Sequence, residues 1–189
     1  MKRIVLTIAV LLSVFCMAAQ QDAAIQFVAS KNKDVKLKFA FAQNNVDPVV
    51  KKTETLKGTL NFAAPRKLSM IYSDPEGDKF VIDGDNLERV KGKKSNKVDL
   101  TKVKSMAGLA NLLCNAMMGR IDDIQKETKA ELTYNQGKTT HDFIFKSGKK
   151  SKSFYKEVEM RYDKKTGRIV YLKLVEKSGK YSEYVLTGK

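Results

Sequence analysis

Few side chains in this 189-residue chain have the type and spacing that catalysis requires. The one histidine, His141, alternates with Phe143 and Phe145, so we interpret it as a side chain packed on a strand face rather than a general base. Asp122 and Asp123 are adjacent, and neighbours on a strand point apart, which makes a poor carboxylate pair. The sequence therefore provides no catalytic residue, and we expect a protein that is not an enzyme.

Motifs for metals and cofactors are also missing from the sequence. Glycine-rich phosphate loops, paired zinc cysteines and a serine-nucleophile elbow are all absent. Cys114 is the only cysteine after Cys16. Its apolar neighbours Leu113 and Met117 predict a buried structural thiol, because a reactive one needs a nearby base. We expect neither a metal nor a cofactor.

The start of the chain has the organisation of an export signal. A short basic start is followed by an almost wholly apolar run over residues 4–15 and then by small residues. We interpret residues 1–20 as a signal peptide and residues 21–189 as a single exported domain. The alternatives are a transmembrane anchor, for which the apolar run is short, and a lipid anchor at Cys16, which follows a phenylalanine rather than a small residue.

The formal net charge of +15 is distributed unevenly. Residues 91–189 hold 23 basic and 11 acidic side chains, whereas residues 21–90 hold 11 and 10. Few of the basic residues are arginines, which together with an export signal argues against nucleic acid. Two interpretations remain. The lysines either protect solvated loops and strand edges from aggregation, or this basic half docks on an acidic membrane-protein partner or an anionic membrane surface.

Hydrophobic patterning predicts an α+β domain that is mostly antiparallel β. A short helix over residues 21–30 precedes about nine strands of alternating apolar residues, and a strongly apolar helix spans residues 101–118. Gly119 is expected to end that helix. Residues 91–100 are interpreted as a lysine-rich connection or a poor strand. Turns are expected at Asn44–Asn45, Pro65, residues 74–77 and residues 83–85.

Residues 58–87 resemble the central segment of the periplasmic outer-membrane lipoprotein carriers, the LolA-type family. The shared pattern is a strand that starts at Gly58 and ends before Pro65, an apolar strand, Pro75, and a strand that ends in Asp83–Gly84. The order of signal peptide, short helix, strands, apolar helix and further strands is similar as well. The resemblance implies an unclosed β-barrel, or half-pipe, covered by helices over an apolar cavity that takes lipoprotein acyl chains.

The resemblance also implies which residues form the site. A flexible apolar lining suits acyl chains, and methionine is well adapted to it. The residues expected to contact acyl chains are Phe39, Leu60, Phe62, Leu68, Met70, Tyr72, Phe80, Met106, Leu113 and Met117. The family's arginine before the first proline, which helps to hold the helical lid closed, is Ala64 here, so Ala64 and the nearby Arg66 are the candidate gate positions. A functional aromatic residue of the family is replaced by Leu68.

Three functions are compatible with these features. The first is a monomeric, exported carrier or chaperone that shields lipoprotein acyl chains for transfer across the periplasm to the outer membrane. The second is a half-barrel module that binds or senses another lipid or lipophilic ligand in the cell envelope. The third is an envelope structural protein whose basic half binds an anionic polymer.

Overall fold

The computed structural model describes residues 19–148, 151 and 153–188, so the predicted signal peptide lies outside the described residues except for Ala19 and Gln20. A helix over residues 19–31 comes first, and α2 (Lys104–Met117) and α3 (Ile121–Thr128) lie between two groups of strands. In this described part no helix combines the length and hydropathy needed to cross a membrane. The strands are β1 (Lys36–Asp47), β2 (Lys52–Ala63), β3 (Lys67–Asp74), β4 (Glu76–Asp83), β5 (Asn86–Lys91), β6 (Lys94–Asp99), β7 (Glu131–Gln136), β8 (Thr140–Lys146), β9 (Tyr155–Asp163), β10 (Ile169–Glu176) and β11 (Tyr181–Gly188).

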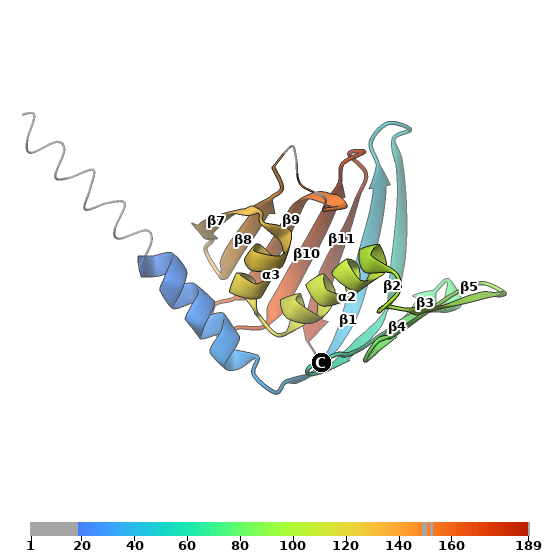
Figure 1. Cartoon of the computed structure of the whole chain (residues 1–189), viewed down its shortest axis with the longest axis horizontal. Coiled ribbons are helices and arrows are strands. Elements are labelled where there is room, and N and C mark those ends of the chain that lie inside the picture. The colour runs from blue at the N-terminus through green and yellow to red at the C-terminus, as the bar shows by residue number, and fades with distance from the viewer. Residues whose placement is uncertain (1–18, 149–150, 152, 189) are drawn as a thin grey trace, which may run out of the picture.

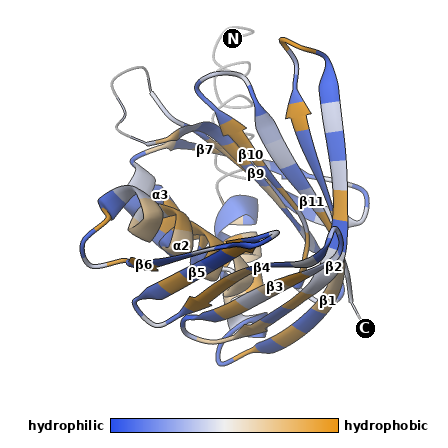
Figure 2. Cartoon of the chain, turned by 90° about the vertical axis from the view of Figure 1, so that its right-hand side faces the viewer, coloured by the Kyte–Doolittle hydropathy of each residue, from blue (hydrophilic) through white to orange (hydrophobic). Residues whose placement is uncertain are grey.

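All these strands form one antiparallel sheet in the order β6-β5-β4-β3-β2-β1-β11-β10-β9-β8-β7. Only the β1–β11 pair joins strands that are distant in sequence, and it connects the two meanders. The sheet curves around α2 and stays open, because β6 and β7 are not paired with each other (Figures 1 and 2). The predicted class, a mostly antiparallel unclosed barrel covered by helices, is confirmed.

One end of the concave face carries a row of apolar side chains. The register places five side chains side by side across β1 to β5, and each is at most 9% exposed. Burial of such side chains stabilises the fold by roughly 1.5–3 kcal/mol each. We name this set the basal row; it consists of Leu37, Phe62, Leu68, Ile82 and Leu87.

The helices are anchored at the same end of the sheet. The buried hydroxyl of Tyr162 on β9 donates to the carbonyl oxygen of Ala116 at 2.8 Å, which ties the last turn of α2 to the sheet. The amide of Asn32, just after the first helix, donates to the carbonyl oxygen of Gly167 at 2.8 Å. Gly119 ends α2 at a φ of 65°, as predicted, and a Cβ there would collide with Val28 of the first helix. We name this end of the half-pipe the base.

The structure corrects three sequence-based expectations. The described residues form eleven strands rather than about nine, because Asn86–Lys91 forms β5, which was not expected, and the lysine-rich segment pairs with it as β6, one of the two interpretations of residues 91–100. The expected turn at Asn44–Asn45 is wrong, because β1 continues to Asp47. Asparagine favours turns through local hydrogen bonds, but here Asn44 bonds instead to side chains of the neighbouring strands, Thr55 and Glu183.

The third correction concerns α3, which the sequence analysis missed. Asp122 and Asp123 lie in its first turn and not on a strand. Acidic side chains are favourable at this end of a helix because they complement the exposed N–H groups. The helix has only eight residues, and its two buried side chains, Ile121 and Ile124, give too short a hydrophobic pattern to distinguish a helix from a loop.

Candidate functional site

A cleft of about 500 Å³ lies at the end of the half-pipe opposite the base, between the concave face and α2. We name it the central cleft and this end the mouth. Its volume is within the range of ordinary small-ligand sites. Part of its wall is apolar or aromatic, contributed by β2, β3, β4, α2, β9, β10 and β11: Leu56, Met70, Tyr72, Phe80, Leu109, Leu113, Tyr155, Leu174 and Tyr184.

The concave face changes from apolar to polar along β1. Residues two apart share a face of a strand, and on this face Leu37, Phe39 and Phe41 are followed by Gln43 and Asn45. The apolar members pack in the core, whereas Gln43 and Asn45 line the central cleft. The cleft therefore has an apolar inner part and a polar outer part, which suits an amphiphilic ligand.

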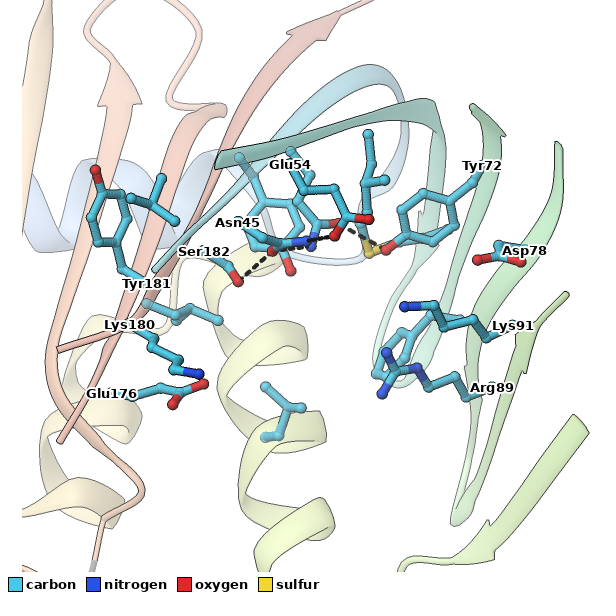
Figure 3. A pocket seen from close by; sticks show the side chains of 18 of the residues that line it. Asn45, Glu54, Tyr72, Asp78, Arg89, Lys91, Glu176, Lys180, Tyr181 and Ser182 are labelled. Carbon is cyan, nitrogen blue, oxygen red and sulfur yellow. Dashed lines mark hydrogen bonds between the residues drawn. The ribbon is translucent and has the colours of Figure 1, made fainter. Parts of the chain in front are cut away.

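Hydrogen bonds connect the polar side chains into a belt across β3, β1 and β11 (Figure 3). The hydroxyl of Tyr72 donates to Oε1 of Gln43 at 2.8 Å, and Nε2 of Gln43 donates to Oδ1 of Asn45 at 2.8 Å. The Ser182 hydroxyl donates to the same Asn45 oxygen at 2.7 Å. We name Gln43, Asn45, Tyr72 and Ser182 the polar belt. These bonds hold otherwise costly polar groups in fixed positions next to apolar surface.

Burial raises the pKa of Tyr72 to about 12, with the nearby charge of Asp78 acting in the same direction and that of Arg89 in the opposite one. The hydroxyl therefore stays protonated at neutral pH, which keeps it a donor to Gln43. Burial raises the pKa of Tyr155 to about 12 as well. Neither of these two tyrosines therefore supplies a phenolate to the cleft at neutral pH.

Charged side chains surround the mouth of the cleft. Arg89 and Lys91 project from β5 on one side, and Lys180 and Glu176 lie on the other (Figure 3). Lys180 is paired with Asp47 at 2.8 Å, and this hydrogen bond lowers the pKa of the Asp47 carboxyl.

A second, larger groove of about 1020 Å³ lies on the other side of α2. It runs between the exposed first turns of α2, the end of α3 and the start of β9, and we name it the helix groove. Leu109 and Tyr155 border both the helix groove and the central cleft. The side chains that line it include Met106, Leu109, Leu112, Ile124, Phe154 and Tyr155.

The structure separates the residues that the sequence analysis grouped as acyl contacts. Met70, Tyr72, Phe80 and Leu113 line the central cleft, and Met106 lies in the helix groove with 39% of its surface exposed. The remaining residues are at most 4% exposed and pack in the core; they are Phe39, Leu60, Phe62, Leu68 and Met117. Contact of any of these residues with acyl chains stays a prediction.

The candidate gate positions lie near the base. Ala64 packs against the core. Arg66 is half-buried, and its Nε donates to the carbonyl oxygen of Gly84 at 2.9 Å, with Asp85 4.0 Å away. Arg66 thus joins the turn after β2 to the turn after β4. Burial raises the pKa of the Cys114 thiol on α2 to about 11, and the charge of Arg66 partly opposes this. Cys114 is 3% exposed, which confirms a buried thiol.

His141 lies on β8, as predicted, between Phe27 and Tyr134. Its Nδ1 is 2.9 Å from the Tyr134 hydroxyl, and its ring centroid is 5.7 Å from that of Phe27. Burial lowers its pKa, and the charge of Lys164 lowers it further. Within the described residues, no cluster of three or more His, Cys, Asp or Glu side chains could hold a metal ion.

Sequence reasoning missed the polar belt and the cations of β5. The signal was present in both cases. On β1 the alternation continues past Phe41 to Gln43 and Asn45, and on β5 it runs from Leu87 through Arg89 to Lys91. On both strands the side chains of one face change from apolar to polar or charged along the strand. Such a change is expected where a strand passes from the core to a ligand site.

An open antiparallel half-barrel with a lined cleft under a helix defines a class of ligand-binding proteins. The family model of the outer membrane lipoprotein carrier protein LolA matches residues 32–188, and the chain belongs to this family. The members of this family are binding or carrier proteins. A search of curated proteins finds no match.

Solved structures share the fold at low sequence identity. MucB is 11% identical over 90% of this chain and 58% of its own, with a TM-score of 0.50. The lipoprotein LppX from Mycobacterium tuberculosis is 11% identical over 88% of this chain and 94% of its own, with a TM-score of 0.42. A LolA superfamily protein from Nitrosomonas europaea is 10% identical over 86% and 90%, with a TM-score of 0.39. These similarities concern the fold alone.

Proposed function

We propose that the protein is an exported, non-enzymatic carrier that shields lipoprotein acyl chains in the central cleft and moves them across the periplasm to the outer membrane. The observation that carries the proposal is the apolar inner part of the cleft, where Met70 and Phe80 of the sheet line the same cavity as Leu109 and Leu113 of α2. Each methylene hidden there is stabilised by about 0.8 kcal/mol relative to water, so even part of an acyl chain is held firmly.

Carriage also requires release, and the packing of α2 supports a movable lid. From Leu112 to Met117 every side chain of α2 is buried, whereas Lys104, Ser105, Met106 and Gly108 are exposed. No side chain caps the first turn of α2 at Val103. The first half of the helix therefore separates from the sheet at a lower cost than the second half, and an acyl chain enters or leaves when this half swings outward.

The first experiment asks whether the purified protein takes up an uncharged, acyl-chain fluorophore and whether native mass spectrometry finds co-purifying acyl species. Phe80→Gln in the central cleft is expected to weaken uptake at least tenfold, about 1.4 kcal/mol. Met106→Gln in the helix groove is the matched control and should leave uptake unchanged. Weaker uptake by the Met106 variant alone would place the ligand in the helix groove instead. Absence of both uptake and bound lipid would contradict the proposal.

A second candidate is a module that binds or senses another lipophilic ligand, and the polar belt favours it, because hydrocarbon alone needs no such hydrogen bonds. The test is release of a purified, labelled lipoprotein from spheroplasts into solution by added protein. Release in proportion to the protein added supports a carrier. A lipoprotein that stays on the spheroplasts while the fluorophore is bound supports the binding module. Docking through the basic residues 91–189 and a monomeric state remain predictions of the carrier model.

A further inference from the structure

Two cations directly adjoin the apolar wall of the central cleft. The register pairs Met70 with Phe80 and Phe80 with Arg89. Arg89 therefore lies directly beside the apolar cleft wall that Met70 and Phe80 form. Lys91 follows two residues later on the same face of β5. Figure 3 shows both side chains directed into the cleft. Leu87, the first residue of this face, belongs to the basal row. Along this face of β5 a buried apolar side chain is therefore followed by two cations.

Neither cation forms an ion pair in the part of the chain that the structure describes. Among the described residues, no carboxylate lies within 4.0 Å of Arg89 or Lys91, whereas Lys180 at the other wall is paired with Asp47. Asp78 is the acid on the neighbouring strand, and its Oδ1 accepts a hydrogen bond from the backbone N–H of Gly92 at 2.6 Å. Glu54 and Glu176 belong to other parts of the mouth (Figure 3).

The charge of Arg89 is directed across the cleft. It acts on the hydroxyl groups of Tyr72 on β3 and Tyr184 on β11, lowering the pKa of each against the larger effect of burial. An unpaired guanidinium beside an apolar wall is well suited to a planar or tetrahedral anion, which it binds with paired hydrogen bonds. Hydrocarbon cargo alone gives no reason for two such cations at this position.

We propose that the central cleft binds a single-chain amphiphile with an anionic head, either a carboxylate or a phosphate. The chain lies along Met70, Phe80 and Leu113, and the head lies against Arg89 and Lys91. This proposal rests on the proposed function only in that the apolar part of the cleft holds an acyl chain; the anionic head makes the ligand one of the lipophilic class named as the second candidate. The cleft volume of about 500 Å³ suits one small ligand.

The test compares palmitate with hexadecanol, which has the same chain and no charge, as competitors of an uncharged acyl fluorophore at neutral pH. Palmitate is expected to bind at least tenfold more tightly than hexadecanol, with a preference that shrinks as salt is added. A lysophosphatidate should share the preference, whereas inorganic phosphate alone should displace no fluorophore. Displacement by millimolar inorganic phosphate would overturn the proposal, since the anion site would then act without the chain.

Arg89→Gln with Lys91→Gln should abolish the preference for palmitate over hexadecanol, mainly through a loss of palmitate affinity. Lys97→Gln is the control and should keep the preference. Lys97 is an exposed cation on the adjacent β6, and its register partner is Glu88, which lies on the opposite face of β5 from Arg89. Circular dichroism and the melting temperature verify that each variant is folded.

Equal binding of palmitate and hexadecanol by the unaltered protein, or a preference that survives both β5 substitutions, overturns this inference and leaves the apolar site intact. Failure of every ligand and of the fluorophore itself overturns the proposed function as well.

Discussion

The base and the mouth of the half-pipe are built from the same strands and differ in chemistry. At the base, the basal row crosses β1 to β5 without a polar atom among its side chains. At the mouth, the same faces of β1, β3 and β11 carry the polar belt, and β5 carries two cations. The alternation of side chains decides which face of the sheet a residue occupies. The position of the residue along its strand, between base and mouth, decides whether a helix covers it. The packing that stabilises the fold and the proposed ligand site thereby lie at opposite ends of one sheet.

The helices enforce this division. The end of α2 is anchored at the base through the Tyr162–Ala116 hydrogen bond, whereas its exposed first turns lie toward the central cleft and the helix groove. A substitution at the base should therefore act mainly on the free energy of unfolding, and one at the mouth mainly on ligand affinity.

The largest effect is expected from Phe62→Ala in the basal row. Phe62 is 2% exposed and is paired with Leu37 on one side and Leu68 on the other, so the substitution should lower the free energy of unfolding by about 3–5 kcal/mol through lost burial and a residual cavity. Urea denaturation measures it. Phe80→Ala, which removes the same side chain at the half-buried cleft wall, should cost clearly less. If the two substitutions lower the free energy of unfolding equally, the base and the mouth contribute equally to the stability of the fold.

The next effect is expected at Gly58, which lies between the two regions. A Cβ at Gly58 would approach the Phe41 ring to 2.8 Å and collide with the carbonyl oxygen of Ile71. Gly58→Ala should therefore destabilise the fold by about 1–3 kcal/mol, the range for overpacking. Gly108 in α2 is the control, because a Cβ there meets open space and alanine favours a helix by roughly 0.5–1 kcal/mol. A neutral Gly58→Ala would show that the Phe41 ring and the Ile71 carbonyl both shift without cost.

A smaller effect is expected from Tyr72→Phe in the polar belt. The change removes the hydrogen bond to Gln43, which is 7% exposed, and should cost about 1 kcal/mol. The ring keeps its edge-to-face contact with Phe41, at a centroid distance of 5.2 Å, so the wall of the cleft is preserved. Thermal unfolding measures the loss, and fluorophore uptake should change little. A loss as large as that of Phe62→Ala would mean that the belt stabilises the fold as strongly as the core.

The base was easier to predict from sequence than the mouth, for a physical reason. Apolar alternation such as Leu37, Phe39 and Phe41 predicts a half-buried strand by itself. Its repetition predicts an antiparallel sheet, and the half-pipe followed from the resemblance over residues 58–87. The polar belt depends on partners that are distant in sequence: Asn45 meets Ser182 only because β1 pairs with β11. Without that pairing, two asparagines in succession favour a turn.

The smallest effect separates the two regions by pH. His141 packs at the base against Phe27 of the first helix, and burial lowers its pKa from the ordinary value of 6.5. As the pH falls through the interval below 6.5, the unfolded chain binds a proton that the folded chain does not, so the free energy of unfolding decreases until the folded pKa is passed. The carboxyl of Asp47 at the mouth has its pKa lowered from 3.8, so its contribution to the free energy of unfolding is present at neutral pH and is lost only in stronger acid.

Urea denaturation between pH 7.5 and 5 should show a modest decline in the free energy of unfolding. His141→Gln should remove this decline, since His141 is the one histidine of the chain. A decline that persists in the variant would assign it to groups other than His141, and the base would then not be the region that responds to mild acid.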